Sequence, residues 1–295
     1  MRTVVCTDLD RTLIYSAAAL ALEGPDETLP RLLCVEHYRA APLSYVTETA
    51  AILIERLAEA AVLVPVTTRT PEQYRRVRLL GKPLPYAVCA NGGHILVDGA
   101  EDAGWAGRVR ARVAETGAEL AEVREHLSRI AGGFVHRLRT ASELFAYAVV
   151  DRAALPAGWL AELSAWCAER GWRTSLQGRK VYCFSFGAEQ GVRGARGVAR
   201  RAGADRMLAA GDSLLDIELL EAADLALRPS HGELAETGWS APNTAVTAAR
   251  GVAAGEEIVE RLLGHVLDPA AIPATGRWRR LLRPADRTGS EPERL

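Results

Sequence analysis

The sequence lacks the features that would mark a nucleic-acid-binding, exported or membrane protein. Its 295 residues carry 36 basic and 37 acidic side chains, a net charge of −1. It therefore has no overall positive charge to attract nucleic acid or an anionic membrane. The longest weakly apolar stretch near the N-terminus, residues 17–22, is far too short to span a bilayer, and two aspartates precede it. We expect a cytoplasmic protein with no membrane anchor and no nucleic-acid partner.

Cysteine is also scarce, and its spacing argues against two further roles. The chain has five cysteines, an odd number, and none of them forms a C-x-x-C pair. Most lie inside apolar runs such as VVC, AVCA and VYCF, where a cysteine is typically a buried, reduced thiol. A disulfide framework and a zinc site are both disfavoured. The five are Cys6, Cys34, Cys89, Cys167 and Cys183.

What the chain does have is enough apolar residues, 48% of the total, to build a sizeable core. Short β-branched or apolar runs alternate with longer stretches that have helical spacing, which predicts an α/β fold with a doubly wound parallel sheet. The expected strands are 3–7, 62–66, 86–90, 207–210 and 225–227. The expected helices are 48–60, 190–202, 214–222 and 256–267, with a shorter one at 71–79.

The pattern changes between residues 98 and 187. Two strand-like segments, "GFVHRLRT" and "ELFAYAVVD", are followed by a helix over 159–170 and by the segments "WRTSLQ" and "RKVYCFSF". This order predicts an α+β cap inserted into the parallel sheet. The predicted division is a first core part at 1–98, the cap at 99–187, a second core part at 188–267 and a peripheral tail at 268–295. Residues 31–47 are expected to form a small hairpin.

Polar side chains follow three of the predicted strands. Asp8 and Asp10 come directly after the first strand, Thr67 follows the second, and Asp212 and Asp216 follow the strand "MLAA". The carboxyl ends of parallel strands meet at one edge of a sheet, so these groups should lie together. Two carboxylates about 4 Å apart repel by about 4 kcal/mol at an effective dielectric of 20. The cluster therefore predicts a hard divalent cation, Mg²⁺, and with it a phosphorylated substrate.

Three motifs carry a family resemblance. "DLDRT", "VTTRT" and "GDSLLD" resemble the D-x-D-x-T, Ser/Thr and G-D-x-x-x-D motifs of the haloacid dehalogenase-like hydrolases. The large insertion after "YAVCANGG" is similar to the subclass with an α/β cap after the third strand. That subclass includes Cof-type and sucrose-phosphate phosphatases. The resemblance covers roughly residues 1–266.

The resemblance implies a role for each motif residue. Asp8 would be the nucleophile that accepts the phosphoryl group, and Asp10 the acid that protonates the leaving alcohol and later activates water. Asp10 would then hold a proton in the resting state, and close carboxylates favour this by raising a pKa. Thr67 would hydrogen-bond the phosphate; Thr68 is its rival, and the match of "TTR" to the family's "TGR" favours Thr67.

The metal ligands are implied in the same way. Asp212 would bind Mg²⁺ directly, and Asp216 directly or through water. Both would act beside the Asp8 carboxylate and the backbone carbonyl of Asp10.

The third motif departs from the family. The phosphate-clamping Lys usually opens the helix before the G-D motif, whereas this chain has Gln190 and Gly191 there. The candidates are Lys180, on the strand "RKVYCF", and Arg193, in the first turns of the helix. We favour Lys180 slightly, since a Lys in an apolar strand must point at something polar. A snorkelling surface Lys is the alternative. Arg11 also stands where many relatives have Gly.

Several other residues have both a functional and a structural interpretation. Arg137 and Arg139 alternate on one cap strand, next to His136, and could meet an anionic substrate; an exposed sheet face is the simpler interpretation. The turn "NGG" at 91–93 has a structural role by default. The basic segment "RWRRLLRPADR" in the tail is either solvated or packs as a helix.

Together these observations predict a Mg²⁺-dependent phosphomonoester hydrolase. Its substrate would be a small phosphorylated metabolite, with sugar phosphates first, and the cap would exclude bulk water and select the leaving group. A phosphomutase is the enzymatic alternative. A phosphate-binding regulatory protein with little turnover is the alternative from another class, whereas a receiver domain is disfavoured by the length of the chain. The sequence leaves the oligomeric state open.

Overall fold

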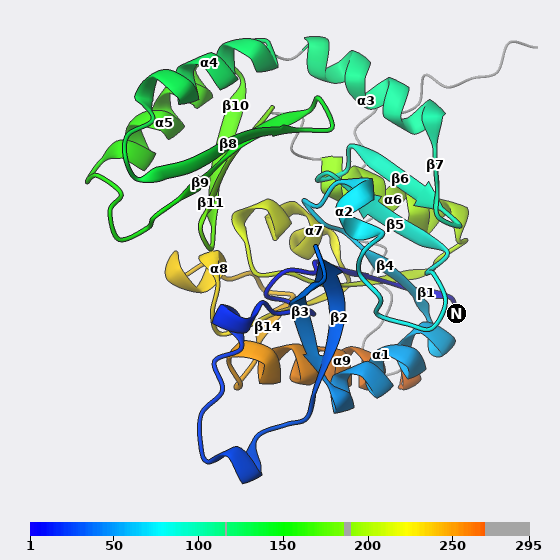
Figure 1. The fold of residues 1–295 in the computed structure, drawn as a ribbon. Coiled ribbons are helices and arrows are strands. Elements are labelled where there is room, and N and C mark those ends of the chain that lie inside the picture. The colour runs from blue at the N-terminus through cyan, green and yellow to red at the C-terminus, as the bar shows by residue number, and fades with distance from the viewer. Residues whose placement is uncertain (116, 186–189, 269–295) are drawn as a thin grey trace, which may run out of the picture.

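A parallel sheet at the centre of the molecule carries the ends of the motif-bearing strands. The computed structural model describes residues 1–115, 117–185 and 190–268, so the predicted tail beyond residue 268 lies outside the described part. The five strands are parallel in the order β14-β13-β12-β1-β4, with β1 in register between β12 and β4. The predicted doubly wound α/β class is confirmed (Figure 1).

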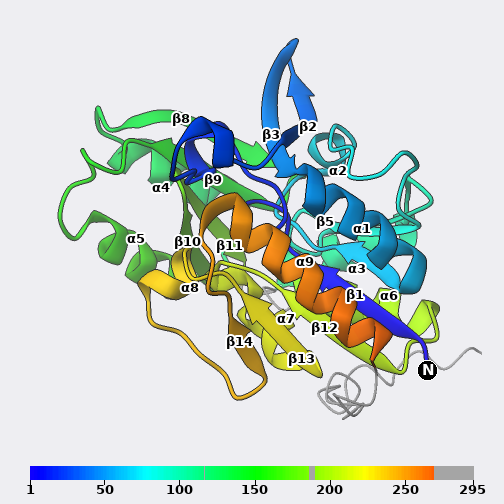
Figure 2. The same ribbon diagram turned by 90° about the horizontal axis from the view of Figure 1, so that it is seen from below.

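Helices cover both faces of this sheet. Helices α1 and α9 lie side by side under one face (Figure 2), where Val5 packs with Ile54 and Ile258. On the other face Val4 and Cys6 pack with residues of α6 and α7. Successive side chains of a strand point to opposite faces, so a strand buried on both faces is apolar throughout. This is why β1 reads Thr-Val-Val-Cys-Thr and is buried at every position.

Two segments of the chain, one before the cap and one after it, contribute the strands of the central sheet. The strands of the central sheet are β1 (Thr3–Thr7), β4 (Val62–Pro65), β12 (Arg206–Ala210), β13 (Leu225–Arg228) and β14 (Thr244–Val246). The helices around it are α1 (Glu48–Ala60), α2 (Pro71–Tyr74), α6 (Gln190–Arg201), α7 (Ile217–Ala222), α8 (Glu233–Glu236) and α9 (Gly251–Leu267). No helix in the described ranges meets the length and hydropathy needed to cross a membrane.

Three smaller sheets complete the fold. The hairpin β2 (Leu32–Tyr38) and β3 (Ala41–Thr47) follows the first motif. The strands β5 (Tyr86–Cys89), β6 (His94–Val97) and β7 (Ala100–Glu101) form an antiparallel sheet that touches the central one through the Val66–Val88 bridge. The cap sheet has the order β10-β11-β9-β8, made by β8 (Val135–Ala141), β9 (Phe145–Val150), β10 (Trp172–Gln177) and β11 (Lys180–Ser185).

Two helices cover one face of the cap sheet, and a third packs against part of the other face. Three cap helices precede or interrupt its strands: α3 (Ala103–Glu115), α4 (Leu120–Ile130) and α5 (Trp159–Ala168). Val123 of α4 and Leu163 of α5 pack with Ala148 and Val181 of the sheet. The opposite face of the sheet is turned toward the core of the molecule (Figure 1).

The element boundaries differ from the sequence prediction in a few places. Helix α9 begins at Gly251, five residues before the predicted start, and α2 ends at Tyr74 rather than at residue 79. Strand β14, with three residues, was not predicted, because so short a run carries no periodicity. The hairpin at 31–47 is confirmed as β2 and β3. The cap sheet lies inside the segment 99–187, while the domain division itself stays a prediction.

Candidate active site

Three aspartates meet at the carboxyl end of the central sheet. Asp8 directly follows β1, and its backbone N–H donates to the carbonyl of Ala210 at 2.9 Å, which ties it to the end of β12. Asp212 and Asp216 follow β12. Carboxylate oxygens of all three lie within 4.8 Å of one another, and all three residues are buried. The structure thus brings together the three side chains that the motifs predicted as metal ligands.

The loop after β12 holds Asp216 in place. Its Oδ2 accepts hydrogen bonds from the backbone N–H of Asp212 at 3.1 Å and of Ser213 at 2.9 Å, and from the Ser213 hydroxyl at 2.8 Å. A Cβ on Gly211 would lie 2.5 Å from the Asp216 side chain, so this position accepts glycine alone. One oxygen of Asp216 is therefore committed to the loop, and the other is left for a ligand.

Burial and neighbouring carboxylates raise the pKa of all three aspartates. Burial raises the pKa of Asp8 well above its usual value, and the charges of Asp216 and Asp212 raise it further. Burial and then Asp216 do the same for Asp212, and burial raises the pKa of Asp216 to about 6. Ionised together they carry three negative charges, which the single ion pair with Arg11 does not balance. An all-oxygen site of this kind fits a hard divalent cation such as Mg²⁺.

Arg11 is the one side chain in ion-pair contact with this cluster in the described part of the chain. Its Nε lies 3.7 Å from Oδ2 of Asp212. That Nε is buried and has no hydrogen-bond partner. The backbone of Arg11 has φ 68°, in the left-handed region that a non-glycine residue adopts at a cost. The departure from the family's Gly therefore places a cation beside Asp212.

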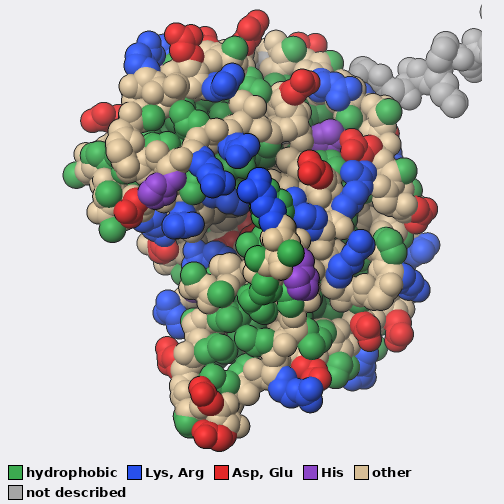
Figure 3. Space-filling model, viewed as in Figure 1, with side chains coloured by type: hydrophobic (Ala, Val, Ile, Leu, Met, Phe, Trp, Pro, Cys, Tyr) green, Lys and Arg blue, Asp and Glu red, His purple; other side chains and the backbone are tan. Residues whose placement is uncertain are grey.

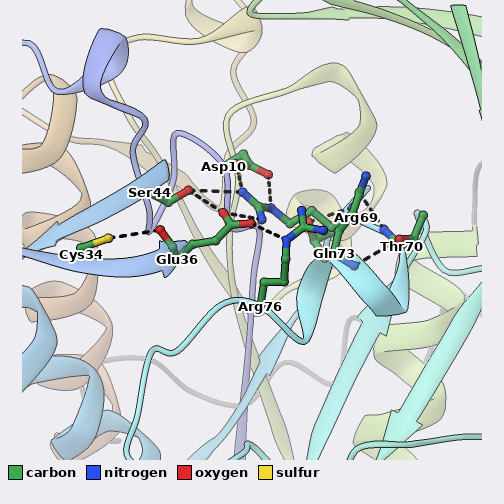
Figure 4. A network of polar contacts seen from close by, with 9 residues as sticks. Asp10, Cys34, Glu36, Ser44, Arg69, Thr70, Gln73 and Arg76 are labelled. Carbon is green, nitrogen blue, oxygen red and sulfur yellow. Dashed lines mark hydrogen bonds and ion pairs between the residues drawn. The ribbon is translucent and has the colours of Figure 1, made fainter. Parts of the chain in front are cut away.

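The second aspartate of the first motif faces away from the other three, toward Arg69. Nε and a terminal nitrogen of Arg69 donate to the two oxygens of Asp10 at 2.7 and 2.8 Å, a bidentate pair. Arg69 is anchored from the hairpin, since it donates to Oε2 of Glu36 at 2.8 Å and Ser44 donates to the same oxygen at 2.8 Å. Arg76 donates to the other oxygen of Glu36 at 3.2 Å (Figure 4).

This pairing changes the expected state of Asp10. Partial burial alone would raise its pKa, but the charge and hydrogen bonds of Arg69, with a smaller contribution from Lys180, lower it overall. The direction is opposite to the resting proton that the sequence predicted for this residue. Without bound ligands the nearest charge to Asp10 is a guanidinium and not a carboxylate, so the acid role of Asp10 stays a prediction. Arg69 is part of the motif segment "TTR", whereas Glu36 and Ser44, which hold it in place, belong to no motif and could not be predicted from one.

Thr67 lies where the sequence placed it, at the end of β4 next to β1. It is buried, and its hydroxyl accepts a hydrogen bond from the backbone N–H of Arg69 at 3.2 Å. Its backbone carbonyl accepts from the N–H of Asn91 at 2.9 Å, so the turn at 91–93 supports this loop. Thr68 is half-buried beside it. The phosphate-binding role of either threonine stays a prediction.

Lys180, of the two candidates for the third motif, faces the site. It opens β11, and its Nζ lies 5.9 Å from the ring centroid of Tyr182 and 6.0 Å from that of Tyr147. Tyr182 and, less strongly, Asp10 raise the pKa of Lys180, although burial opposes the shift. The sequence predicted that Lys180 points at something polar, and Asp10 is one such group. Arg193 is half-buried in the first turn of α6, and its role stays open.

Glu233, which the sequence analysis did not single out, links the cap to the core. It is buried, and it accepts hydrogen bonds from the Ser175 hydroxyl at 2.7 Å and the backbone N–H of Leu176 at 2.9 Å, both on β10. It also accepts from the N–H of Leu214, between Asp212 and Asp216, at 3.0 Å. No spacing around "HGELAE" signals this contact, because the three donors come from distant segments.

Solved structures of known proteins share this arrangement of core and cap. A sucrose-phosphatase from Synechocystis, in complex with sucrose and phosphate, aligns with a TM-score of 0.61 at 15% identity, over 89% of this chain and 98% of that one. A protein from Thermoplasma acidophilum aligns with a TM-score of 0.58 at 12% identity, over 89% and 98%. A protein related to trehalose-6-phosphate phosphatase aligns with a TM-score of 0.51 at 17% identity, over 90% and 99%.

The chain thus shares its fold, a parallel sheet with an additional α+β cap sheet, with these structures, and this fold agrees with the one that the motif resemblance implied. No family model matches the sequence, and no curated protein matches it. At these identities the likeness establishes the fold, and the chemistry has to be argued from the site.

Proposed function

We propose that the protein is a Mg²⁺-dependent phosphomonoester hydrolase, located in the cytoplasm, that acts on a small phosphorylated metabolite. The observation that carries this proposal is the placement of Asp8, Asp212 and Asp216, buried with oxygens within 4.8 Å of one another at a strand end. Such a cluster suits a cation and the phosphate that the cation binds. Two structures of the same fold are described as a sucrose-phosphatase and a trehalose-6-phosphate phosphatase related protein, which supports sugar phosphates as the first class to test.

The proposed reaction has two steps. In the first, a carboxylate oxygen of Asp8 attacks the phosphorus, the ester P–O bond breaks, and the leaving alcohol takes a proton from Asp10. In the second, Asp10 takes a proton from water as the water oxygen attacks the phosphorus. The bond from phosphorus to Asp8 then breaks, and inorganic phosphate leaves. Thr67 and Lys180 would orient the phosphate.

The metal would be held by the three buried carboxylates together with the backbone carbonyl of Asp10. Bound Mg²⁺ would neutralise the charge of the phosphate and of the carboxylates. The carboxylates of Asp8, Asp212 and Asp216 would then be ionised, despite the pKa values that burial and mutual repulsion raise. The ion pair of Arg11 with Asp212 supplies one positive charge of the chain's own.

The pair between Arg69 and Asp10 favours the second step over the first. Both oxygens of Asp10 accept hydrogen bonds from the guanidinium, so in this state the carboxyl is an anion suited to take a proton from water. To protonate a leaving alcohol, Asp10 has to loosen this pair and first take up a proton from solvent. Esters with a good leaving group, such as aryl phosphates, need that proton least and should react fastest.

An assay with a generic aryl phosphate and Mg²⁺ tests the proposal. Wild type should release phosphate, and Asp8→Asn should lose activity about a thousandfold or more, because it removes the nucleophile. Asp26→Asn changes an exposed aspartate far from the motifs in sequence and serves as the matched control. If no phosphate release that depends on Asp8 is found across a broad panel of phosphate esters, the protein is a binding or regulatory protein instead.

The products of the reaction distinguish a phosphomutase from a phosphatase. A mutase keeps the phosphoryl group and returns it to another hydroxyl. Release of free phosphate from a hexose monophosphate without formation of an isomer would exclude it, and formation of the isomer would favour it.

A further inference from the structure

The face of the cap sheet opposite α4 and α5 carries basic and aromatic side chains beside the apolar residues that pack with α3 and the core. Residues directly opposite each other in paired strands lie on the same face. Tyr182 pairs with Tyr147, which pairs with Arg139 on the next strand. In the adjacent row Lys180 pairs with Val149, and Val149 with Arg137. Two tyrosines and three cations therefore share this face; we call Arg137, Arg139, Tyr147, Lys180 and Tyr182 the basic cap face.

The basic cap face lies over the motif loops. Phe145 and Phe184 are on the same face as Tyr182, and all three pack in one cluster with Ala90 and Leu215 of the core. Leu215 lies between Asp212 and Asp216, so the sheet rests on the loop that holds the carboxylates. Lys180, at one end of the face, is close enough for its charge to act on Asp10.

In the described part of the chain none of the three cations of this face forms an ion pair, although the charge of Lys180 acts on Asp10. Arg137, Arg139 and Lys180 are exposed, and none has a carboxylate within ion-pair distance among the residues at 1–115, 117–185 and 190–268. Figure 3 shows Lys and Arg side chains gathered where the cap faces the core. Like charges on one surface repel, and an anionic ligand removes that repulsion.

Tyr147 and Tyr182 lie in the row next to Lys180 and Arg137, and an aromatic ring suits contact with a sugar ring or a carbon chain. The rings of Tyr147 and Tyr182 are 5.5 Å apart, and both residues are at least half-buried. Two strand spacings separate Lys180 from Arg137, which is about 10 Å. A molecule with an anionic group at each end and about one sugar unit between them spans such a distance.

We propose that the leaving group of the substrate carries a second anionic group, which Arg137 and Arg139 bind. The part of the molecule between this group and the reacting phosphate lies against Tyr147, which is more exposed than the buried Tyr182. The substrate class is therefore a doubly anionic metabolite rather than a monophosphate of a neutral sugar. This inference rests on the proposed phosphatase function, because it assigns the far end of the same site.

The test compares three esters that differ in the leaving group: glucose 6-phosphate, 6-phosphogluconate with a carboxylate, and fructose 1,6-bisphosphate with a second phosphoryl group. Wild type should hydrolyse at least one of the two doubly anionic esters with kcat/KM about tenfold or more above that of glucose 6-phosphate. The double variant Arg137→Gln with Arg139→Gln should lose that preference and leave the neutral-sugar ester within about threefold. Arg124→Gln, on α4 at the covered side of the cap, is the matched control.

The outcomes separate the two proposals. A preference for the carboxylate ester or for the bisphosphate identifies which anion binds, and the aryl phosphate shows that the double variant still folds and reacts. Equal kcat/KM for the three esters, or an equal loss on all three in the double variant, would overturn the inference. If wild type hydrolyses no ester, the proposed function fails, and calorimetric binding of 6-phosphogluconate against glucose 6-phosphate still decides the subsite. Equal affinities for the two ligands would then overturn it.

Discussion

Glu36 should be the most stability-sensitive polar residue near the site. Its side chain is fully buried on β2, and it accepts hydrogen bonds from Arg69 and Ser44 at 2.8 Å and from Arg76 at 3.2 Å. Replacing it with Ala removes the acceptor of all three donors. Arg69, with a side chain that is 11% exposed, keeps Asp10 as its partner, whereas Arg76 is 28% exposed and can reach water.

These contacts set the size of the effect. Breaking a buried ion pair by removing one partner costs about 3–5 kcal/mol, because the other charge is left unpaired. Here neither arginine is left wholly unpaired, so Glu36→Ala should lower the free energy of unfolding by about 2–4 kcal/mol. Arg69→Gln should cost less, about 1–3 kcal/mol. The reason is that Glu36 keeps Arg76 and Ser44, and Asp10, 44% exposed, can be hydrated.

Urea unfolding of the variants measures this directly. The midpoint should shift while the slope of the free energy with urea stays constant, and Arg76→Gln should cost below about 1 kcal/mol, as a partly exposed pair does. Glu125→Gln on the surface of α4 is the control and should change stability by less than about 0.5 kcal/mol. A loss below about 1 kcal/mol for Glu36→Ala would refute the reasoning, since it would mean that Arg69 does not depend on the hairpin.

Three further changes test other contacts. Arg11→Gly removes the cation beside Asp212 and places at φ 68° a residue that adopts this conformation without strain. Mg²⁺ should then bind about tenfold more tightly in calorimetry, because an ion pair that competes with the metal for Asp212, worth about 1.4 kcal/mol, is lost. An unchanged Mg²⁺ affinity would count against this competition. Arg69→Gln should raise the pKa of Asp10, because Arg69 lowers this pKa against the opposing effect of partial burial. The alkaline limb of the pH profile of kcat/KM for an alkyl phosphate should therefore move to higher pH. If it does not move, the titration of Asp10 does not produce that limb. The backbone N–H of Trp105 in α3 and the ion pair with Arg201 lower the pKa of Asp102. Asp102 therefore stabilises the folded state above its unfolded pKa of about 3.9, and this stabilisation is lost as the pH falls through the lower folded value. Asp102→Ala should therefore cost about 1 kcal/mol at pH 7 and less in acid, and a difference independent of pH would contradict this assignment.

The sequence was sufficient for the parts of the site that lie in one strand and its following loop. The apolar run before Asp8 had to be a strand buried on both faces, and the helical spacing after it required a crossover, so Asp8, Thr67 and Asp212 had to share one edge of a parallel sheet. The structure places them at the ends of β1, β4 and β12. Local periodicity and the handedness of the crossovers decide such features, and both are present in the sequence.

The charge environment of the site, by contrast, depends on the tertiary structure. The state of Asp10 is decided by Arg69, which Glu36 holds from a separate hairpin. The contact between cap and core is decided by Glu233, whose donors come from β10 and from the loop after β12. Electrostatic energies depend on distances of a few ångströms between groups far apart in the chain, and a sequence without its fold does not contain those distances.

The pair "DLD" shows the division most clearly. The sequence alone determined that Asp8 and Asp10 stand at the end of a buried strand, because burial of the preceding residues leaves no other place for two carboxylates. The tertiary structure alone decided that they lie in opposite environments. Burial and neighbouring carboxylates raise the pKa of Asp8, whereas the guanidinium of Arg69 lowers that of Asp10, because the two side chains, two residues apart, meet different neighbours.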